Sequence, residues 1–420
     1  MKNLHYLQQE AIDEGNLNIR VRDKNTGGPI DGAKVFISYT GDPTRTIEQL
    51  ESDNSGNVES VTLSTPPLEY SMEPSEMQPY AEYTVQVRAE GYREVTINGI
   101  SVMSDQTSLQ EVDMNEVDTP GNPIDEINIP ANTLYGNFPE KIPEDEIKSV
   151  SETGEIVLSR VVIPEYVVVH DGVPNDSTAM DYYIKYKDYI KNVASSEIYA
   201  TWPDATIRAN VLAIMSFTLN RVYTEWYRGK GKNFTITSST AFDQKFVYGR
   251  NTFTSIANVV NEMFENYLSR PNVRQPILTQ YCDGQRVSCP RWLSQWGSKQ
   301  LGDQGYSAIE ILRYYYGSNM YINTADAISG IPASWPGYDL RIGSTGSKVR
   351  QLQEQINRIS QNYPAIPRIN PDGIYGKKTE EAVRKFQSVF GLPVTGVVGY
   401  KTWYAISDIY VAVSRIAELS

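Results

Sequence analysis

The sequence predicts a multidomain protein that consists of an all-β sandwich, a central α+β domain and a small helical domain, in that order. Three observations predict this order. Residues 16–112 alternate apolar and polar side chains in short runs that are separated by turn residues. Residues 159–330 mix helical and strand patterns without regular βαβ alternation. Residues 338–420 repeat apolar positions at helical spacing, and 420 residues are enough for several separate cores.

The first domain, residues 1–112, is predicted to be a β-sandwich. The run NLNIRVRD alternates strictly and places Leu17, Ile19 and Val21 on one face. Further alternating runs follow the turn signals GGPIDG and SDNSGNV, and short strands at regular spacing are typical of sandwiches. The order of these runs resembles the carboxypeptidase-regulatory and Cna-B types of immunoglobulin-like module. That resemblance implies a structural role without chemistry of its own.

Charge is segregated along the chain. Residues 1–150 hold 27 acidic and 10 basic side chains, a balance of −17, whereas residues 151–420 hold 24 and 28, a balance of +4. This pattern indicates an acidic, masking segment attached to a body that meets an anionic partner. Residues 113–158 are acidic and rich in proline, which predicts a linker or extended strap. A passive tether and a protease-accessible activation segment, with a cut in 140–155, are both open.

Several classes of protein are excluded by composition. No basic block interleaved with aromatic residues occurs, so we expect no nucleic-acid partner. The first 15 residues lack an apolar stretch, and no run of 18 apolar residues occurs, so we expect neither an ordinary signal peptide nor a membrane span. The excess of 29 Tyr over 10 Phe suits a protein that handles sugars, or it is a compositional habit.

The most specific motif lies in residues 338–420. The block DGIYGKKT begins with Asp372 and Gly373, which predict a tight turn, and Gly376 is expected to allow close backbone approach. Together with GLPVTGVV, this block resembles the peptidoglycan-binding domain type 1 family. The resemblance implies binding of wall glycan or its peptides, with Asp372, Gly373, Tyr375 and Gly376 as candidate residues. The alternative is that these residues only hold three helices together.

Glu197 precedes a Trp-Pro pair and a predicted helix in which Pro203 takes the first position. One apolar stripe predicts that this helix is buried on one side; its members are Ile207, Val211, Ile214 and Met215. Glu197 is therefore expected on the irregular lead-in, facing a groove. The field of the helix N-terminus would favour the ionised carboxylate, and burial against Tyr199 or Trp202 would raise its pKa. A solvated residue near a helix start is the alternative.

The segments SSEIYATWPDATIRANV (195–211) and LSQWGSKQLGDQGYSAIEILRYYYG (293–317) resemble the SpoIID/LytB family of lytic transglycosylases, with Ser298 where that family has Ala. The resemblance covers roughly residues 180–325. It implies a SpoIID-like catalytic domain in which Glu197 is the catalytic acid. With the flanking domains included, the whole chain resembles the SleC-type spore cortex-lytic enzymes.

That family uses one carboxyl group, because the muramyl 6-hydroxyl is the nucleophile and no water needs activation. Hydrolytic glycosidases instead need a second carboxylate. Four carboxylates are available in this region, each in a helix or turn where we expect solvation: Asp204, Asp243, Glu262 and Glu310. Ring and amide side chains suit sugar binding, and the candidates are Tyr199, Gln280, Tyr281, Gln295 and Trp296. Core packing for Trp296 and backbone bracing for Gln295 are the alternatives.

A metal site is not expected. Some SpoIID proteins bind zinc through Cys and His, but this chain has only Cys282 and Cys289 in the equivalent region, and its histidines are His5 and His170. The two cysteines are predicted to form a disulfide or to remain free thiols. No cofactor is expected.

The family resemblance also implies a setting. We expect a zymogen in the cortex or coat region of a spore, acting on cortex peptidoglycan during germination, where a subtilisin-like protease activates it. A hydrolytic muramidase and a non-catalytic wall-binding protein are the alternative functions. The sequence does not indicate an oligomeric state.

Overall fold

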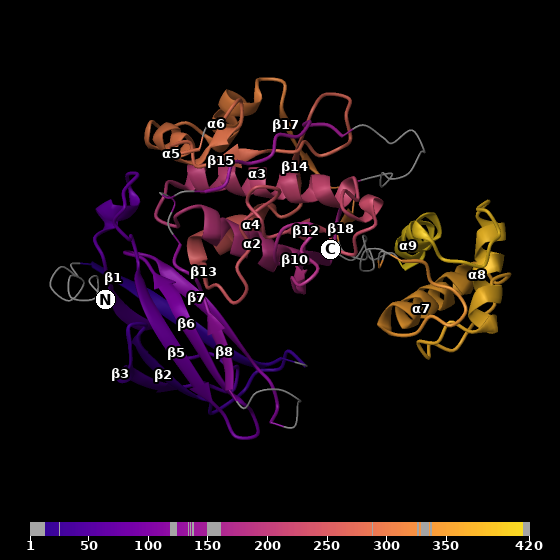
Figure 1. The fold of residues 1–420 in the computed structure, drawn as a ribbon, viewed down its shortest axis with the longest axis horizontal. Coiled ribbons are helices and arrows are strands. Elements are labelled where there is room, and N and C mark those ends of the chain that lie inside the picture. Colours follow the sequence, from indigo (N-terminus) through magenta and orange to yellow (C-terminus); the bar gives the residue numbers. More distant parts are fainter. Residues whose placement is uncertain are drawn as a thin grey trace.

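The computed structural model describes residues 13–24, 26–117, 124–132, 134, 136, 138–148, 161–287, 289–325, 327–328, 336 and 338–414. A β-rich N-terminal part lies beside a mixed central part, and a helical C-terminal part stands to one side (Figure 1). The protein is thus a β-rich, multidomain chain with several helices. Among the described residues, none of the helices has both the length and the apolar character needed to cross a membrane.

The N-terminal part contains two sheets that share one buried core. The first sheet has the order β13-β7-β1-β4 and the second has the order β3-β2-β5-β6-β8. Leu17, Ile19 and Val21 of β1 point into the core, as their alternation predicts. The strands of the N-terminal part are β1 (Asp13–Asp23), β2 (Lys34–Tyr39), β3 (Asp42–Glu51), β4 (Val61–Thr65), β5 (Ala81–Arg88), β6 (Glu94–Val102), β7 (Thr107–Met114) and β8 (Ile124–Asn128).

The predicted linker is shorter in the structure than residues 113–158. β7 continues to Met114, and β8 pairs in parallel with β6 from Glu94–Ile124 to Asn98–Asn128. A parallel neighbour needs a crossover rather than a hairpin, so the local sequence of this five-residue strand carries little signal. Residues 149–160, which include part of the predicted cleavage region, lie outside the described residues.

The N-terminal part is joined to the central part by main-chain pairing. β13 (Thr252–Phe253) belongs to the central part of the sequence but forms the edge strand beside β7. The side chain of Asn251 bonds both the N–H and the carbonyl of Ser101, at 3.0 and 2.9 Å. These contacts hold the two parts together beside helix α2 (Tyr186–Glu197), which packs against β13.

The central part is built around helix α3. Its helices are α2 (Tyr186–Glu197), α3 (Asp204–Tyr223), α4 (Thr254–Met263), α5 (Gln295–Asp303) and α6 (Ala308–Tyr316). Its short strands are β9 (Val162–Ile163), β10 (Tyr166–His170), β11 (Asp181–Lys185), β12 (Ile236–Thr237), β14 (Asn266–Ser269), β15 (Tyr281–Cys282), β16 (Leu293–Ser294), β17 (Tyr321–Thr324) and β18 (Ala327–Ile328).

Helix α3 is buried on all sides, so the prediction of a one-sided stripe is wrong. Neighbouring helices and β14 cover it, and polar residues along it are satisfied internally, as where Asn210 donates to Ser298 Oγ at 2.8 Å. Pro203 is the N-cap rather than the first helical residue. The helix therefore begins one position later than predicted.

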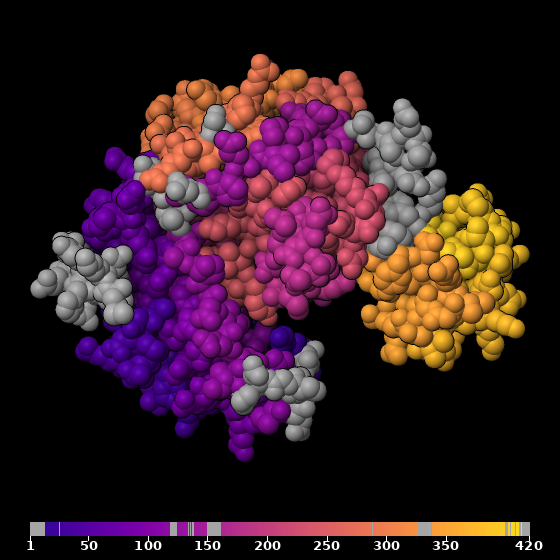
Figure 2. Space-filling view, viewed as in Figure 1, coloured from indigo at the N-terminus to yellow at the C-terminus, as the bar shows by residue number. Residues whose placement is uncertain are grey.

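The C-terminal part consists of α7 (Ser347–Asn362), α8 (Lys377–Val389) and α9 (Tyr400–Ser414). Two buried glutamine side chains tie its loops together. Gln353 donates to Asp372, Ile374 and Thr379, and Gln387 accepts from the backbone N–H groups of residues 395 and 396. In Figure 2 this part projects from the rest of the molecule.

A buried ion pair lies in the central core. The Arg221 side chain on α3 is fully buried and donates to the fully buried carboxylate of Asp243 at 2.7 Å. Asp243 also accepts from the hydroxyl of Tyr227 and from both the N–H and the hydroxyl of Thr237. Because every oxygen of this carboxylate is occupied, its charge is compensated without water.

Replacement of Arg221 by Met should lower the free energy of unfolding of the central part by ~3–5 kcal/mol, because it leaves a buried carboxylate without its cation. The matched control is Arg208→Met, since Arg208 pairs with Asp204 and Glu262 at the surface. Exposed pairs contribute at most about 1 kcal/mol. Urea unfolding of both variants measures the difference, and equal losses would contradict the role assigned to the buried pair.

Candidate active site

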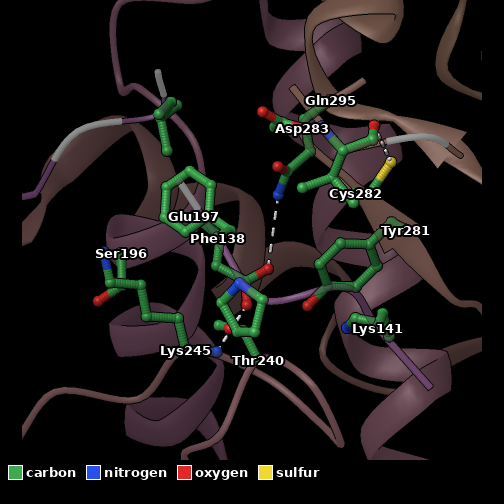
Figure 3. Close-up of a pocket in the computed structure, with 13 residues that line it drawn as sticks. Phe138, Lys141, Ser196, Glu197, Thr240, Lys245, Tyr281, Cys282, Asp283 and Gln295 are labelled. Atoms are coloured by element: carbon green, nitrogen blue, oxygen red, sulfur yellow. Dashed lines mark hydrogen bonds between the residues drawn. The ribbon is translucent and has the colours of Figure 1, made fainter. Parts of the chain in front are cut away.

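Glu197 is the last residue of helix α2 and lies at the base of a pocket (Figure 3). Its side chain is 6% exposed. The pocket contains about 520 Å³ of empty space, part of it open to solvent. Its lining residues are Leu134, Phe138, Pro139, Lys141, Ser196, Glu197, Thr240, Lys245, Tyr281, Cys282, Asp283, Val287 and Gln295.

The position of Glu197 differs from the expected lead-in to the next helix. It ends α2, so the nearest helix terminus is a C-terminus, and the N-terminus of α3 begins only at Asp204. The carbonyl groups at a helix C-terminus disfavour a negative charge. The expectation that a helix field would favour the ionised form is therefore wrong in sign.

Two hydrogen bonds hold the Glu197 carboxyl in place. The backbone N–H of Lys245 donates to Oε1 at 2.6 Å, and Nε2 of Gln295 approaches Oε2 at 3.5 Å. The first donor comes from the loop after β12 and the second from α5, so the orientation of the acid depends on two separate segments. Tyr281 of β15 lines the same pocket.

Burial raises the pKa of Glu197 above its ordinary value of 4.5. The charge of Lys141, the N–H of Lys245 and the hydroxyl of Tyr281 oppose that rise but do not cancel it. Burial also lowers the pKa of Lys245 to about 8, with the nearby charge of Arg250 acting in the same direction. A carboxyl group with a raised pKa can hold a proton close to neutral pH, which is what a general acid requires.

The predicted sugar-binding residues divide into two groups. Tyr281 and Gln295 line the pocket, and Gln295 contacts Glu197. Tyr199, Gln280 and Trp296 are buried and do not line it. Each of these three instead bonds the main chain of residues 130–148, which we call the strap.

The strap runs across the central part (Figures 1 and 2) and contributes Leu134, Phe138, Pro139 and Lys141 to the lining of the pocket. The Leu134 N–H donates to the hydroxyl of Tyr199 at 3.0 Å, and its carbonyl accepts from the indole of Trp296 at 3.1 Å. The amide of Gln280 accepts from the N–H of Glu144 and donates to the carbonyl of Ile142. The strap is therefore bound along its length by groups of the central part.

Two carboxylates anchor the far end of the strap. Glu144 receives two hydrogen bonds from Arg221, at 2.6 and 2.9 Å. Glu146 receives two from Arg270, at 2.6 and 2.7 Å. Paired bonds between arginine and a carboxylate are among the stronger polar contacts in proteins.

Sequence reasoning missed several residues that line the pocket. Phe138, Pro139 and Lys141 come from the strap, and Lys245 comes from the loop after β12. No local pattern marks them, since they meet Glu197 only through the fold. Asp283 was also missed, although its Asp-Gly pair next to Tyr281 and Cys282 is a visible turn signal.

The four carboxylates that were considered as second acids lie away from the pocket lining. Asp204 and Glu262 pair with Arg208, and Glu310 caps helix α6. Asp243 is fully buried, so the expectation that it is solvated is wrong. Its oxygens are occupied by Arg221, Tyr227 and Thr237.

Asp283 is the carboxylate other than Glu197 in the described lining of the pocket. Its oxygens accept from the N–H groups of Gln285, Arg286 and Val287, at 3.0–3.3 Å. Both oxygens are therefore committed to a loop, which favours a structural role for this side chain.

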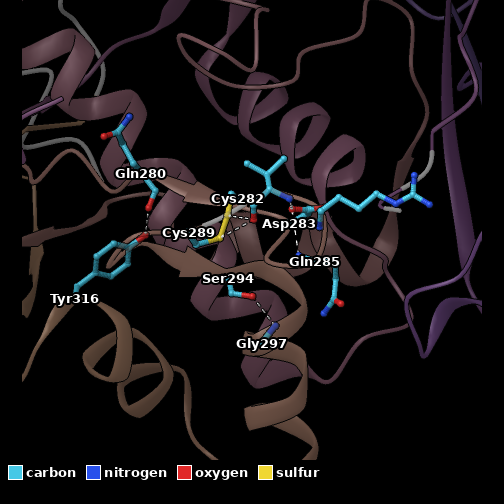
Figure 4. Close-up of a disulfide and its surroundings, with 10 residues drawn as sticks. Gln280, Cys282, Asp283, Gln285, Cys289, Ser294, Gly297 and Tyr316 are labelled. Atoms are coloured by element: carbon cyan, nitrogen blue, oxygen red, sulfur yellow. Dashed lines mark hydrogen bonds between the residues drawn. A yellow bond between two sulfur atoms is a disulfide. The ribbon is translucent and has the colours of Figure 1, made fainter. Parts of the chain in front are cut away.

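Cys282 and Cys289 form a disulfide beside the pocket (Figure 4). The loop that it closes is the one organised by Asp283, and Ser294 caps helix α5 next to it. Within the described parts of the chain, no group of three or more His, Cys, Asp and Glu side chains is arranged to hold a metal ion.

The four candidate residues of the C-terminal motif are involved in holding the turn. The Asp372 side chain accepts from Ile374 and Gln353, and Gly373 adopts a φ of 76°. Tyr375 is buried and donates to the carbonyl of Gly396. Gly376 has open space where a side chain would stand, so the expected close backbone approach is wrong.

Comparison with known proteins bears on this C-terminal part. Residues 345–406 match the family model PG_binding_1, a peptidoglycan binding domain. The zinc D-Ala-D-Ala carboxypeptidase of Streptomyces albus G is 38% identical over 74 residues. That match covers 17% of this chain, and the chain spans about a quarter (27%) of the relative's length.

Solved structures give further likenesses. The SleB N-terminal domain is 32% identical, with a TM-score of 0.16, over 17% of this chain and 93% of that one. GBS52, a minor pilin of Streptococcus agalactiae, is 16% identical, with a TM-score of 0.18, over 26% and 48%. The family model and the carboxypeptidase identify a cell-wall-related protein with a C-terminal peptidoglycan-binding type domain.

The raised pKa of Glu197 predicts a pH-dependent cost in stability. Between pH 4.5 and the raised pKa, the folded protein keeps a proton that the unfolded chain has lost, so stability falls as pH rises through this window. Glu197→Gln has no proton to lose. Relative to the wild type it should therefore gain stability as pH rises, by about 1.4 kcal/mol for each pH unit within this window.

Urea unfolding at a series of pH values measures this effect. Glu310→Gln is the matched control, because the cap contacts of Glu310 lower its pKa and reverse the sign. A stability difference between Glu197→Gln and the wild type that stays constant with pH would contradict the raised pKa.

Proposed function

We propose that this protein is a peptidoglycan lytic transglycosylase of the SleC type, held as a zymogen, that cleaves spore cortex glycan. The observation that carries the proposal is Glu197: a buried carboxyl with a raised pKa, in a pocket beside Tyr281 and Gln295. The C-terminal family match supports the choice of polymer. A module of that kind would keep the enzyme on an insoluble substrate and raise its local concentration.

The chemistry requires one carboxyl group. Protonated Glu197 donates its proton to the glycosidic oxygen as the bond to the muramyl C1 breaks. The muramyl 6-hydroxyl then attacks C1, and its proton passes to the Glu197 carboxylate. The products are a 1,6-anhydro-muramyl end and a free 4-hydroxyl, and the acid is regenerated without water.

Asp283 supports a second candidate, a hydrolytic muramidase. It lines the same pocket and would be the base that activates water. We favour the transglycosylase, because three backbone N–H groups already occupy the Asp283 oxygens. A non-catalytic wall-binding role would leave unexplained why a buried acid is placed in a pocket.

Glu197→Gln should lower the rate of glycan cleavage by a factor of about 10² to 10⁴, because it removes the titrating proton but keeps the shape of the side chain. Purified cortex is digested with protein freed of its strap, and the products are identified by mass spectrometry. Anhydro-muramyl ends are expected from the wild type, and binding to intact cortex should be unchanged in the variant.

The matched control is Asp283→Asn, which keeps most of the acceptor contacts of the loop. It should still release anhydro-muramyl ends. Reducing ends from the wild type, with loss of cleavage in Asp283→Asn, would instead support the muramidase. More than about a tenth of activity in Glu197→Gln would rule out the single-acid mechanism.

The strap supports the zymogen part of the proposal. Phe138 and Pro139 of the strap line the pocket, and Tyr199 and Trp296 bond the strap at Leu134, another lining residue. A cut between the end of the strap at residue 148 and the start of the described central part at residue 161 would break the covalent link between them. The strap would then be linked covalently only to the acidic N-terminal part. A subtilisin-like protease is the partner that the family resemblance suggests.

Cleavage of the full-length protein between residues 148 and 161 should raise its activity on cortex fragments at least tenfold, because the cover can then dissociate. A specific protease site placed in this segment makes the cut, and activity is compared before and after it. The control carries the same site in the loop 53–56, whose printed backbone hydrogen bonds are made within the N-terminal part. Equal rates before and after cleavage would refute the zymogen proposal but not the transglycosylase.

A further inference from the structure

Lys245 is the basic residue that the central part itself contributes to the described lining of the pocket (Figure 3). The other basic residue in that lining, Lys141, belongs to the strap and would leave with it. The backbone N–H of Lys245 donates to Glu197, so the main chain of this lysine is fixed beside the acid. Its ammonium stands at the end of a flexible four-carbon stem and can therefore reach a group on a ligand that is bound at Glu197.

The partners of the Lys245 ammonium come from the strap. The ammonium donates to Oδ1 of Asn132 at 2.5 Å and lies 5.8 Å from the ring centre of Phe138. Both partners are neutral, and among the described residues no carboxylate forms an ion pair with this lysine. The strap therefore occupies the cation without neutralising it.

The acids in the described lining are engaged in other contacts. Oε1 of Glu197 accepts from the backbone of Lys245 and not from its ammonium, and the Asp283 oxygens accept from three N–H groups of their own loop. With a pKa of about 8, Lys245 carries its charge at neutral pH. A cation that has no carboxylate partner within the protein is suited to bind a carboxylate of a ligand.

We propose that Lys245 binds a carboxylate on the side chain of the muramyl residue that is cleaved. The lactyl group stands on C3 of the sugar ring whose C1 would face Glu197, and it ends in a carboxylate or carries a short peptide that does. A lactam or an amide at this position is neutral and would gain little from the ammonium. The substrate class is therefore glycan with anionic muramyl side chains, and this inference rests on the proposed role of Glu197.

The strap and the substrate then use the same ammonium in turn. In the intact chain Asn132 and Phe138 hold it, and departure of the strap removes both partners at once. A substrate carboxylate would replace a neutral acceptor with a charged one, and charge-assisted hydrogen bonds are roughly twice as strong as neutral ones. This exchange favours bound substrate over return of the strap.

The experiment measures binding rather than cleavage, in full-length Glu197→Gln protein that has been cut between residues 148 and 161. Soluble glycan fragments are titrated by calorimetry in two pairs. One pair ends in the muramyl lactyl group and the other in lactyl-L-alanine, and the members of each pair differ only as carboxylate and carboxamide. Glu197→Gln prevents turnover of the fragments and keeps an acceptor for the N–H of Lys245.

Three further substitutions are made in this background. Lys245→Met removes the ammonium and Lys245→Arg keeps a positive charge, and both retain the backbone N–H that contacts residue 197. The matched control is Lys232→Met, because Lys232 also donates to an amide oxygen, that of Asn175 at 2.9 Å, but at the exposed surface and outside the described lining of the pocket.

The Glu197→Gln background should bind the carboxylate member of at least one pair about tenfold more tightly than the carboxamide, because the lost contact is a hydrogen bond between charged groups. Lys245→Met should abolish this preference, whereas Lys245→Arg and Lys232→Met should keep it. Equal affinity for acid and amide in the background, a preference that survives Lys245→Met, or no binding of any fragment would overturn the proposal.

The outcome is separate from that of the proposed activity. If the preference depends on Lys245 but protein with Glu197 intact does not cleave cortex, only the transglycosylase proposal fails. If that protein cleaves cortex but the preference is absent, only the role of Lys245 fails.

Discussion

The site depends on one buried carboxylate that takes no direct part in it. Asp243 neutralises the buried charge of Arg221, and its carboxylate also accepts from the backbone N–H of Thr237 in β12. These contacts fix the turn after β12. This turn binds two residues that line the pocket: the carbonyl of Asp243 accepts from Lys141, and the N–H of Lys245, two residues later, donates to Glu197. An ion pair so deeply buried adds little net stability, but it fixes the geometry of the groups around it.

The acid itself is placed at a cost in stability. Glu197 ends a helix and is almost fully buried, and both features disfavour its charge, in keeping with its raised pKa. Rigid neighbours make that cost tolerable, because α3 is buried on every side and packs beside α2. A buried, destabilised acid of this kind is characteristic of functional sites and rare at positions that serve only the fold.

The sequence predicted those features that depend on local order along the chain. Alternation identified β1, helical spacing identified α7 and α8, and the Trp-Pro start marked the helix after Glu197. Features that depend on long-range contacts were missed, because they have no local pattern. Lys141 and Lys245 line the pocket of Glu197 although they lie 56 and 48 residues away in the sequence. The full burial of α3 was missed for the same reason. Polar side chains on this helix, such as Asn210, find their partners in distant segments, so the local sequence does not show that they are buried.

The uneven charge along the sequence has a structural counterpart. Three acidic residues of the first third form ion pairs with arginines of the central part. The pairs are Glu76–Arg286, Glu144–Arg221 and Glu146–Arg270. Acidic residues of the strap therefore neutralise the arginines that lie around the covered surface. If the strap leaves, Arg221 retains Asp243, whereas Arg270 retains only neutral acceptors, Asn319 and the carbonyl of Tyr316, among its described contacts. In the proposed mechanism, these arginines would then be available to an anionic polymer, so one charge pattern would serve both the covered and the open state.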